Sequence, residues 1–113
     1  MQLRTEELPD NVTRAVLSGR LDIDGASKID VQMNVLAGAK RALVVDLADV
    51  SFMASMGLRT LMTCARAISS KGGRIALAAP QENVARVLET SGAADLMGVY
   101  PTLDAAVAHV RGA

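Results

Sequence analysis

A buried strand followed by an amphipathic helix is the feature that most constrains the fold of this chain. Residues Ala42–Val45 form an uninterrupted apolar run, rich in branched side chains, that ends at Asp46. The run is too short for a helix and suits a central parallel strand that is buried on both faces. After a short turn, apolar residues recur at spacings of three and four from Ser55 onward, which is typical of one helical face. These apolar positions are Leu58, Leu61, Met62, Ala65 and Ile68.

The predicted start of this helix presents a hydroxyl group. We predict that Ser55 is the N-cap, because a serine there can accept a hydrogen bond from a first-turn amide. Gly57 is a poor helix former, so its place in the first turn indicates that something approaches the backbone closely. In the simpler interpretation Ser55 is only a cap, worth about 0.5–2 kcal/mol. This interpretation is compatible with a phosphorylation site, since the amides that make a cap also attract a phosphate. Ser55 is therefore predicted to be an exposed hydroxyl where phosphate could switch a binding surface.

The remaining elements alternate in a way that defines the fold class. Strands are predicted at Gln2–Glu7, Val12–Ser18, Arg74–Ala78 and, as a short edge strand, Gly98–Tyr100. Further helices are predicted at Gly25–Ala37, from Pro80 to a closing Gly92, and after a capping Thr102. Strands that alternate with helices form a mostly parallel sheet covered by helices. We expect one α/β domain over residues 1–113, with a mixed, mostly parallel sheet of four to five strands flanked by about four helices.

Composition excludes several classes of partner. Twelve basic and twelve acidic residues give zero formal net charge, which argues against nucleic acid, because such binding depends on phosphate neutralisation. We find no basic amphipathic helix for an anionic membrane surface and no apolar stretch near the roughly 20 residues of a membrane span. The first ten residues have no apolar signal core. A single cysteine, Cys64, excludes an internal disulfide and fits a reducing cytoplasm; it is expected to be a small, partly buried filler.

Enzymatic and metal-binding interpretations are weaker. A nucleophile elbow needs G-x-S-x-G, but Met53 stands where the first glycine belongs, and the sole histidine, His109, lies close to the end of the sequence. The segment Asp22–Gly25 resembles the start of a calcium loop but lacks the spaced later ligands, so Asp24 is more simply a helix cap. One cysteine and one histidine cannot form a zinc site. We therefore predict a protein that is not an enzyme and uses no cofactor or metal.

Three segments resemble one known family. They are Ser18–Asp22, Leu43–Leu58, and Leu88–Gly92 together with Tyr100–Ala106, and the resemblance covers nearly the whole chain. The chain resembles a STAS domain of the anti-sigma factor antagonist type. In that family a serine kinase of the histidine-kinase-like ATPase fold phosphorylates a serine at the helix start, which matches Ser55. The phosphorylated antagonist releases the kinase, and a PP2C-type phosphatase resets the switch.

One departure from the family pattern leaves two functions open. The family sequence is Asp-Ser-Ser/Ala-Gly, whereas this chain has Ala54-Ser55-Met56-Gly57. The retained Ser55 and Gly57 favour a phosphorylation-controlled module that captures an anti-sigma kinase. Ala54, in place of the acidic residue, favours an unswitched STAS subunit of a larger signalling or lipid-transport assembly.

The predicted binding face gathers beyond the carboxyl ends of the strands, where sites in open sheets of this type form. It comprises the turn after Asp46, the first turn of the Ser55 helix and the segment around Gly19 to Asp24. Core filling is the favoured role for Met53, and for Met56 core and surface roles are equally open. The residues predicted to contact the partner are Gly19, Arg20, Asp22, Asp24, Met53, Ala54, Ser55, Met56, Gly57 and Arg59.

Overall fold

The computed structural model describes residues 1–112 as a five-stranded sheet with helices on both faces. The strands lie in chain order, β1-β2-β3-β4-β5, with β1 antiparallel to β2 and every other pair parallel. This arrangement confirms the predicted α/β class and its mixed, mostly parallel sheet. The strands are β1 Gln2–Leu8, β2 Val12–Leu21, β3 Ala42–Met53, β4 Arg74–Ala78 and β5 Gly98–Tyr100. The α-helices are α1 Ile23–Ala39, α2 Ser55–Ser70, α3 Glu82–Thr90 and α4 Leu103–Val110, and short 3₁₀ turns cover Pro9–Asn11 and Ala93–Asp95.

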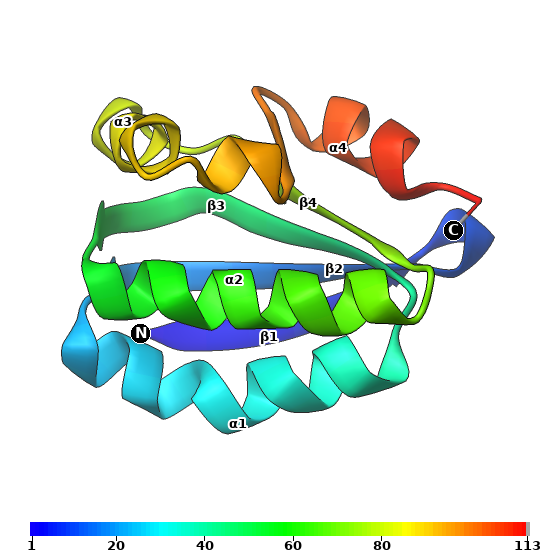
Figure 1. The fold of residues 1–113 in the computed structure, drawn as a ribbon, viewed down its shortest axis with the longest axis horizontal. Helices are drawn as coiled ribbons and strands as arrows, with labels where there is room; N and C mark the ends of the chain where they lie inside the picture. Colours follow the sequence, from blue (N-terminus) through cyan, green and yellow to red (C-terminus); the bar gives the residue numbers. More distant parts are fainter. Residues whose placement is uncertain (113) are drawn as a thin grey trace.

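The two faces of the sheet bury different side chains because residues alternate along each strand. On β3, Leu43, Val45 and Leu47 pack in a cluster that includes the buried faces of α1, α2 and α3. Val44 points the other way and packs with α4. Figure 1 shows α1 and α2 side by side along the sheet, with α4 on the far side of β4 from α2. Continuous apolar runs in β3 and β4 are thus explained by burial on both faces.

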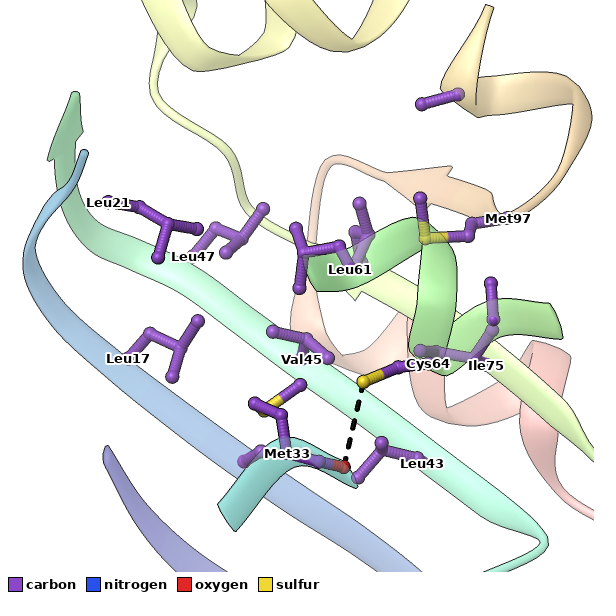
Figure 2. Close-up of a cluster of buried hydrophobic side chains, with 14 of the residues drawn as sticks. Leu17, Leu21, Met33, Leu43, Val45, Leu47, Leu61, Cys64, Ile75 and Met97 are labelled. Carbon is purple, nitrogen blue, oxygen red and sulfur yellow. Dashed lines mark hydrogen bonds between the residues drawn. The ribbon is translucent and has the colours of Figure 1, made fainter. Parts of the chain in front are cut away.

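The larger cluster is aliphatic, and it contains Cys64 (Figure 2). We expected this thiol to be partly buried, but its exposed fraction is 0%. The Cys64 thiol donates to the Met33 carbonyl oxygen at 3.6 Å and so joins α2 to α1. Burial, with a smaller effect from Asp30, raises the pKa of Cys64 to about 11. A neutral thiol in this position packs as a small apolar group.

The strand β3 is longer than its apolar run indicates, and this corrects one prediction. There is no turn after Asp46: the strand continues to Met53, paired with β2 as far as Leu21. The Asp46 carboxylate is satisfied inside the sheet, because it accepts bonds from Arg14 Nε at 3.1 Å and from the Ala48 amide at 3.0 Å. Since its charge is paired by Arg14, Asp46 does not end the strand. The first predicted part of the binding face is therefore strand rather than turn.

The start of α1 corrects a second prediction, which was that Asp24 caps this helix. Its N-cap is Asp22, whose carboxylate accepts a hydrogen bond from the Gly25 amide at 2.9 Å, and Asp24 lies exposed in the first turn. Two residues expected to leave the preceding strand, Gly19 and Arg20, are still within β2. The predicted cap of α4 is correct, because Thr102 Oγ1 accepts a bond from the Ala105 amide.

Candidate functional site

The site forms where β2 and β3 end beside each other and α2 begins. Leu21 of β2 is in register with Met53 of β3, and the Ala54 amide then donates to the Leu21 carbonyl oxygen at 3.0 Å. This bond continues the ladder by one residue and holds Ala54 extended, at φ −104° and ψ 174°. The helix can start only after it. The sheet thereby fixes the position of Ser55 through backbone hydrogen bonds.

Ser55 is exposed, but it is not the N-cap. Ala54 occupies the cap position without a side-chain hydrogen bond, and Ser55 is the first residue of α2. The prediction was wrong by one residue because the hydrogen bond to Leu21 carries the extended conformation through Ala54. No capping side chain covers the first-turn amides, which are the partially positive end of the helix dipole. An exposed hydroxyl thus stands beside amides that favour a negative charge.

Gly57 is required by the fold rather than exposed to a partner. It is buried, and a Cβ atom built on it would lie 2.4 Å from Leu21 Cγ and 2.5 Å from the Leu21 carbonyl oxygen. The close approach predicted for this glycine is therefore made by the end of β2. Gly57 lets α2 press against that strand and so helps to position Ser55.

The end of β2 brings a charged pair to the same edge. The Arg20 guanidinium lies over the Phe52 ring at 4.3 Å from its centre, and Arg20 Nε is 3.5 Å from Asp22 Oδ2. The Gly25 amide, with a smaller contribution from Arg20, lowers the pKa of Asp22 below its ordinary value of 3.8. Gly19, also predicted for this face, adopts a φ of +113° that favours glycine. The β2–β3 register pairs Gly19 with Val50 and Arg20 with Phe52, within three residues of Met53.

The two methionines of the motif have different environments. Met53 is 3% exposed and belongs to the core, which was its favoured role, whereas Met56 is 41% exposed. Met56 and Arg59 line a groove between α1 and α2 of about 690 Å³, together with Ile23. Asp24 is exposed at the start of α1. Of the predicted contact residues, Met53 and Gly57 thus support the surface from below.

A second wall of the site was missed from the sequence. Ser55, Ala54 and Leu58 share a hollow of about 570 Å³ with the exposed side of α3. The Asn83 side chain donates to the Ser51 carbonyl oxygen at 2.9 Å and so joins the start of α3 to the C-terminal end of β3. Because α3 follows β4, the strand order could have indicated that α3 lies at the same carboxyl edge, but no sequence pattern marks the polar side chains that form this wall. The residues that α3 and its end contribute are Asn83, Arg86, Val87, Thr90 and Ser91.

His109 does not line the hollow that contains Ser55. His109 lies on α4, on the other face of the sheet, where its ring centre is 5.2 Å from that of Tyr100. Within residues 1–112, no group of three or more His, Cys, Asp or Glu side chains is placed to hold a metal ion. Nor does any helix in this range have the length and apolar character to cross a membrane. The site is a surface that consists of the exposed Ser55 hydroxyl, the start of α2 and the two hollows that flank them.

The fold and the sequence together define the family to which this chain belongs. The sequence matches the STAS domain over residues 4–106, and the chain belongs to the STAS domain family. Two relatives that match this chain in sequence are named as anti-sigma factor antagonists, one of them as a putative one.

The anti-sigma F factor antagonist of Paenibacillus polymyxa is 30% identical over 86 residues, which are 74% of each chain. A Thermotoga neapolitana protein, whose name places it among the anti-sigma factor antagonists, is 33% identical over 75 residues, or 66% of each chain. The chain thus matches slightly less than two thirds of that relative's length. A solved anti-sigma factor antagonist from Mycobacterium paratuberculosis has a TM-score of 0.87 at 29% identity, over 97% of this chain and 93% of that one.

Proposed function

We propose that this protein is an anti-sigma factor antagonist that captures an anti-sigma serine kinase and is switched off by phosphorylation of Ser55. The kinase has the histidine-kinase-like ATPase fold, and a PP2C-type phosphatase removes the phosphate. The protein itself performs no catalysis. Because its partners control transcription, the proposed place of action is the cytoplasm.

The exposure of Ser55 at the first position of α2 is the observation that carries this proposal. A kinase must bring the γ-phosphate of ATP in line with the hydroxyl oxygen, so the serine must be accessible. The backbone around it is rigid, since β2 and Gly57 fix its position. An accessible hydroxyl on a rigid support suits a kinase that is also the binding partner.

A phosphate at this position is compatible with the fold. It would add a charge of about −1.5 to −2 beside helix amides that favour anions. Arg86 lines the same hollow, and its pair with Glu82 is a 3.3 Å surface contact between highly exposed groups, which holds it weakly. SpoIIAA has the same fold, with TM-scores of 0.80 and 0.74 at 24% and 23% identity, and has been solved unphosphorylated and phosphorylated.

The switch acts on the partner surface. When two proteins associate, charges in the contact lose water and must find partners. An added phosphate in the middle of the proposed contact surface would be left unpaired or would repel acidic groups of the kinase. Binding is then lost while the antagonist stays folded.

The test is phosphorylation by the anti-sigma kinases of the same organism with ATP, followed by mapping of the phosphate by mass spectrometry. We expect one phosphate, on Ser55, and none on the Ser55→Ala variant. Ser51 is also exposed and lies four residues earlier, so Ser51→Ala is the matched control and should be phosphorylated like the unchanged protein. Absence of phosphate on Ser55 with every such kinase would exclude the switch.

A second function is favoured by Ala54. Where the family has an acidic residue, this chain has a methyl group, and the helix start carries no capping side chain. If a kinase uses that carboxylate to position the serine, this chain acts instead as an unswitched STAS subunit of a larger signalling or lipid-transport assembly. Comparison of the unchanged protein with Ala54→Asp distinguishes the two: phosphate on Ser55 of the unchanged protein supports the switch, and phosphate on Ser55 only in Ala54→Asp supports the unswitched subunit.

A further inference from the structure

Two exposed arginines flank Ser55 from different helices. Arg59 follows Ser55 by four residues on α2, a spacing at which two side chains are neighbours on a helix surface. Arg86 belongs to α3 and lines the hollow that also contains Ser55. Figure 1 shows α3 at the end of the sheet where α2 begins. Ser55 therefore has one cation on its own helix and another across the hollow.

The face of α3 that carries Arg86 is held toward α2. Four residues that line the hollow recur at spacings of three and four, so they share this face of the helix: Asn83, Arg86, Val87 and Thr90. The Asn83 side chain donates to the Ser51 carbonyl oxygen at 2.9 Å, and Val87 packs against the core. These contacts fix the backbone from which Arg86 extends, while its long side chain stays exposed.

Neither arginine is firmly engaged in the unphosphorylated protein. Arg59 takes part in none of the ion pairs found within residues 1–112, although Asp30 lines the same groove between α1 and α2. Arg86 contacts Glu82 at 3.3 Å, and the exposed fractions of the two side chains are 71% and 91%. Such an exposed pair contributes little to stability. A phosphate, with more charge than one carboxylate, can therefore displace Glu82 from Arg86.

The lining of the hollow suits an anion that is bound by arginine. Within residues 1–112, the side chains that line it include no carboxylate, and Arg86 is the single charged residue among them. Two other lining residues, Leu58 and Val87, are partly buried apolar side chains that pack against the core. Charge pairs are stronger beside an apolar surface than in open water. An arginine can also bind two oxygens of one phosphate at once.

We propose that Arg59 and Arg86 form a clamp that binds the phosphate of phosphorylated Ser55 within the same chain. Arg59 binds it from α2, and Arg86 leaves Glu82 and binds it from α3. The clamp joins the two helices across the hollow and withdraws both cations from the partner surface. A kinase that paired with these arginines would leave the phosphate unpaired, so the clamp strengthens the switch. This inference rests on the proposed phosphorylation of Ser55.

The test uses the full chain with phosphoserine introduced at position 55 during translation, so it does not require the kinase. The second pKa of a phosphoserine is ordinarily about 6, and phosphorus NMR follows it as the pH is changed. Nearby cations favour the doubly charged phosphate and lower this pKa. Arg59→Gln and Arg86→Gln should therefore each raise the phosphate pKa by about 0.3–0.7 relative to the phosphoprotein that keeps both arginines.

Arg66→Gln is the matched control, because it removes another exposed cation from α2. Arg66 is eleven residues from Ser55, which is about 16 Å along a helix. Surface charges are largely screened beyond about 8 Å at physiological salt. This substitution should therefore leave the phosphate pKa unchanged.

Two results would overturn the clamp. One is a phosphate pKa that either Arg59→Gln or Arg86→Gln leaves unchanged, because one of the two cations would then not contact the phosphate. The other is an equal effect of all three substitutions, because the phosphate would then respond only to the total charge of the protein. Neither result bears on whether a kinase phosphorylates Ser55, which the mapping by mass spectrometry decides separately.

Discussion

The proposed binding surface depends on Gly57, although this residue is buried beneath it. A methyl group at this position would lie 2.4 Å from Leu21 Cγ and 2.5 Å from the Leu21 carbonyl oxygen. The side chain of Leu21 is fully buried, so neither atom can move freely. We expect Gly57→Ala to lower the free energy of unfolding by about 1–3 kcal/mol, measured by urea denaturation.

Gly38→Ala is the matched control for this prediction. Gly38 lies in the last turn of α1, and nothing lies within 4 Å of a Cβ atom built on it. The change should raise the free energy of unfolding by up to about 1 kcal/mol, because alanine is the better helix former. If the two variants change stability equally, close packing of Gly57 is not what requires a glycine.

The position of Ser55 also shows how far a sequence pattern reaches at the residue scale. Helical spacing predicted an amphipathic helix with an exposed Ser55 at its N-cap; the helix and the exposure are confirmed, but Ser55 is the first residue of the helix and not its cap. The pattern could not show that the Ala54 amide bonds to Leu21, a residue more than thirty positions away. That bond moves the cap by one residue. Cap preferences describe local geometry, whereas here a contact with a neighbouring strand decides which residue is the cap.

Among the elements, helices and buried strands were predicted better than strand ends. The apolar run 42–45 indicated β3, but its second half, with exposed Ala48, Asp49 and Ser51, has no strand pattern. That half is held by pairing with β2, across a register shift between Val16 and Ser18. Backbone pairing between distant segments can maintain a strand whose side chains do not alternate regularly. A local sequence pattern contains no information about such pairing, so the end of β3 could not be predicted from it.

The start of α1 should carry a measurable pH dependence. Hydrogen bonding from the Gly25 amide stabilises the charged form of Asp22 and lowers its pKa in the folded protein below 3.8. A carboxylate with a lowered folded pKa stabilises the protein above the unfolded pKa, and this contribution is lost as the pH falls through the folded pKa. It is thus fully present at neutral pH and disappears below pH 3.8.

Asp22→Asn isolates this effect, because the amide oxygen can still accept the Gly25 hydrogen bond but does not titrate. Thermal melts of both proteins should show a constant difference in melting temperature above pH 3.8. Below it, the unchanged protein should lose its advantage over the variant. A difference that stays constant through this range would show that the Asp22 pKa is the same in the folded and unfolded states.

At the scale of the whole molecule, the order of strands and helices follows from the sequence, and the walls of the site do not. Alternating strand and helix patterns indicated a mostly parallel sheet, and right-handed connections between neighbouring strands leave few other arrangements. The wall formed by α3 depends on polar contacts such as Asn83 with Ser51 and Gln81 with Ala48. These side chains are exposed and have no periodicity to reveal them. The sequence therefore placed Ser55 on the surface without showing what lies opposite.

The last prediction separates binding from folding. Ser55→Glu adds a negative charge at the first position of α2, where the helix dipole favours it by about 0.3–1 kcal/mol. The melting temperature should therefore stay the same or rise slightly. Binding of the anti-sigma kinase, measured by calorimetry, should weaken by about 100-fold or more, because the charge lies in the proposed contact surface and would lose water without gaining a partner.

The control for this comparison is Ser69→Glu at the other end of the same helix. Ser69 is exposed and lies in the last turn of α2, where the dipole disfavours a negative charge. This variant should melt slightly lower and bind the kinase normally, so the two substitutions have opposite effects on stability and on binding. If Ser55→Glu instead lowers the melting temperature and weakens binding no more than Ser69→Glu does, the first turn of α2 is part of the fold only, and the kinase binds another surface.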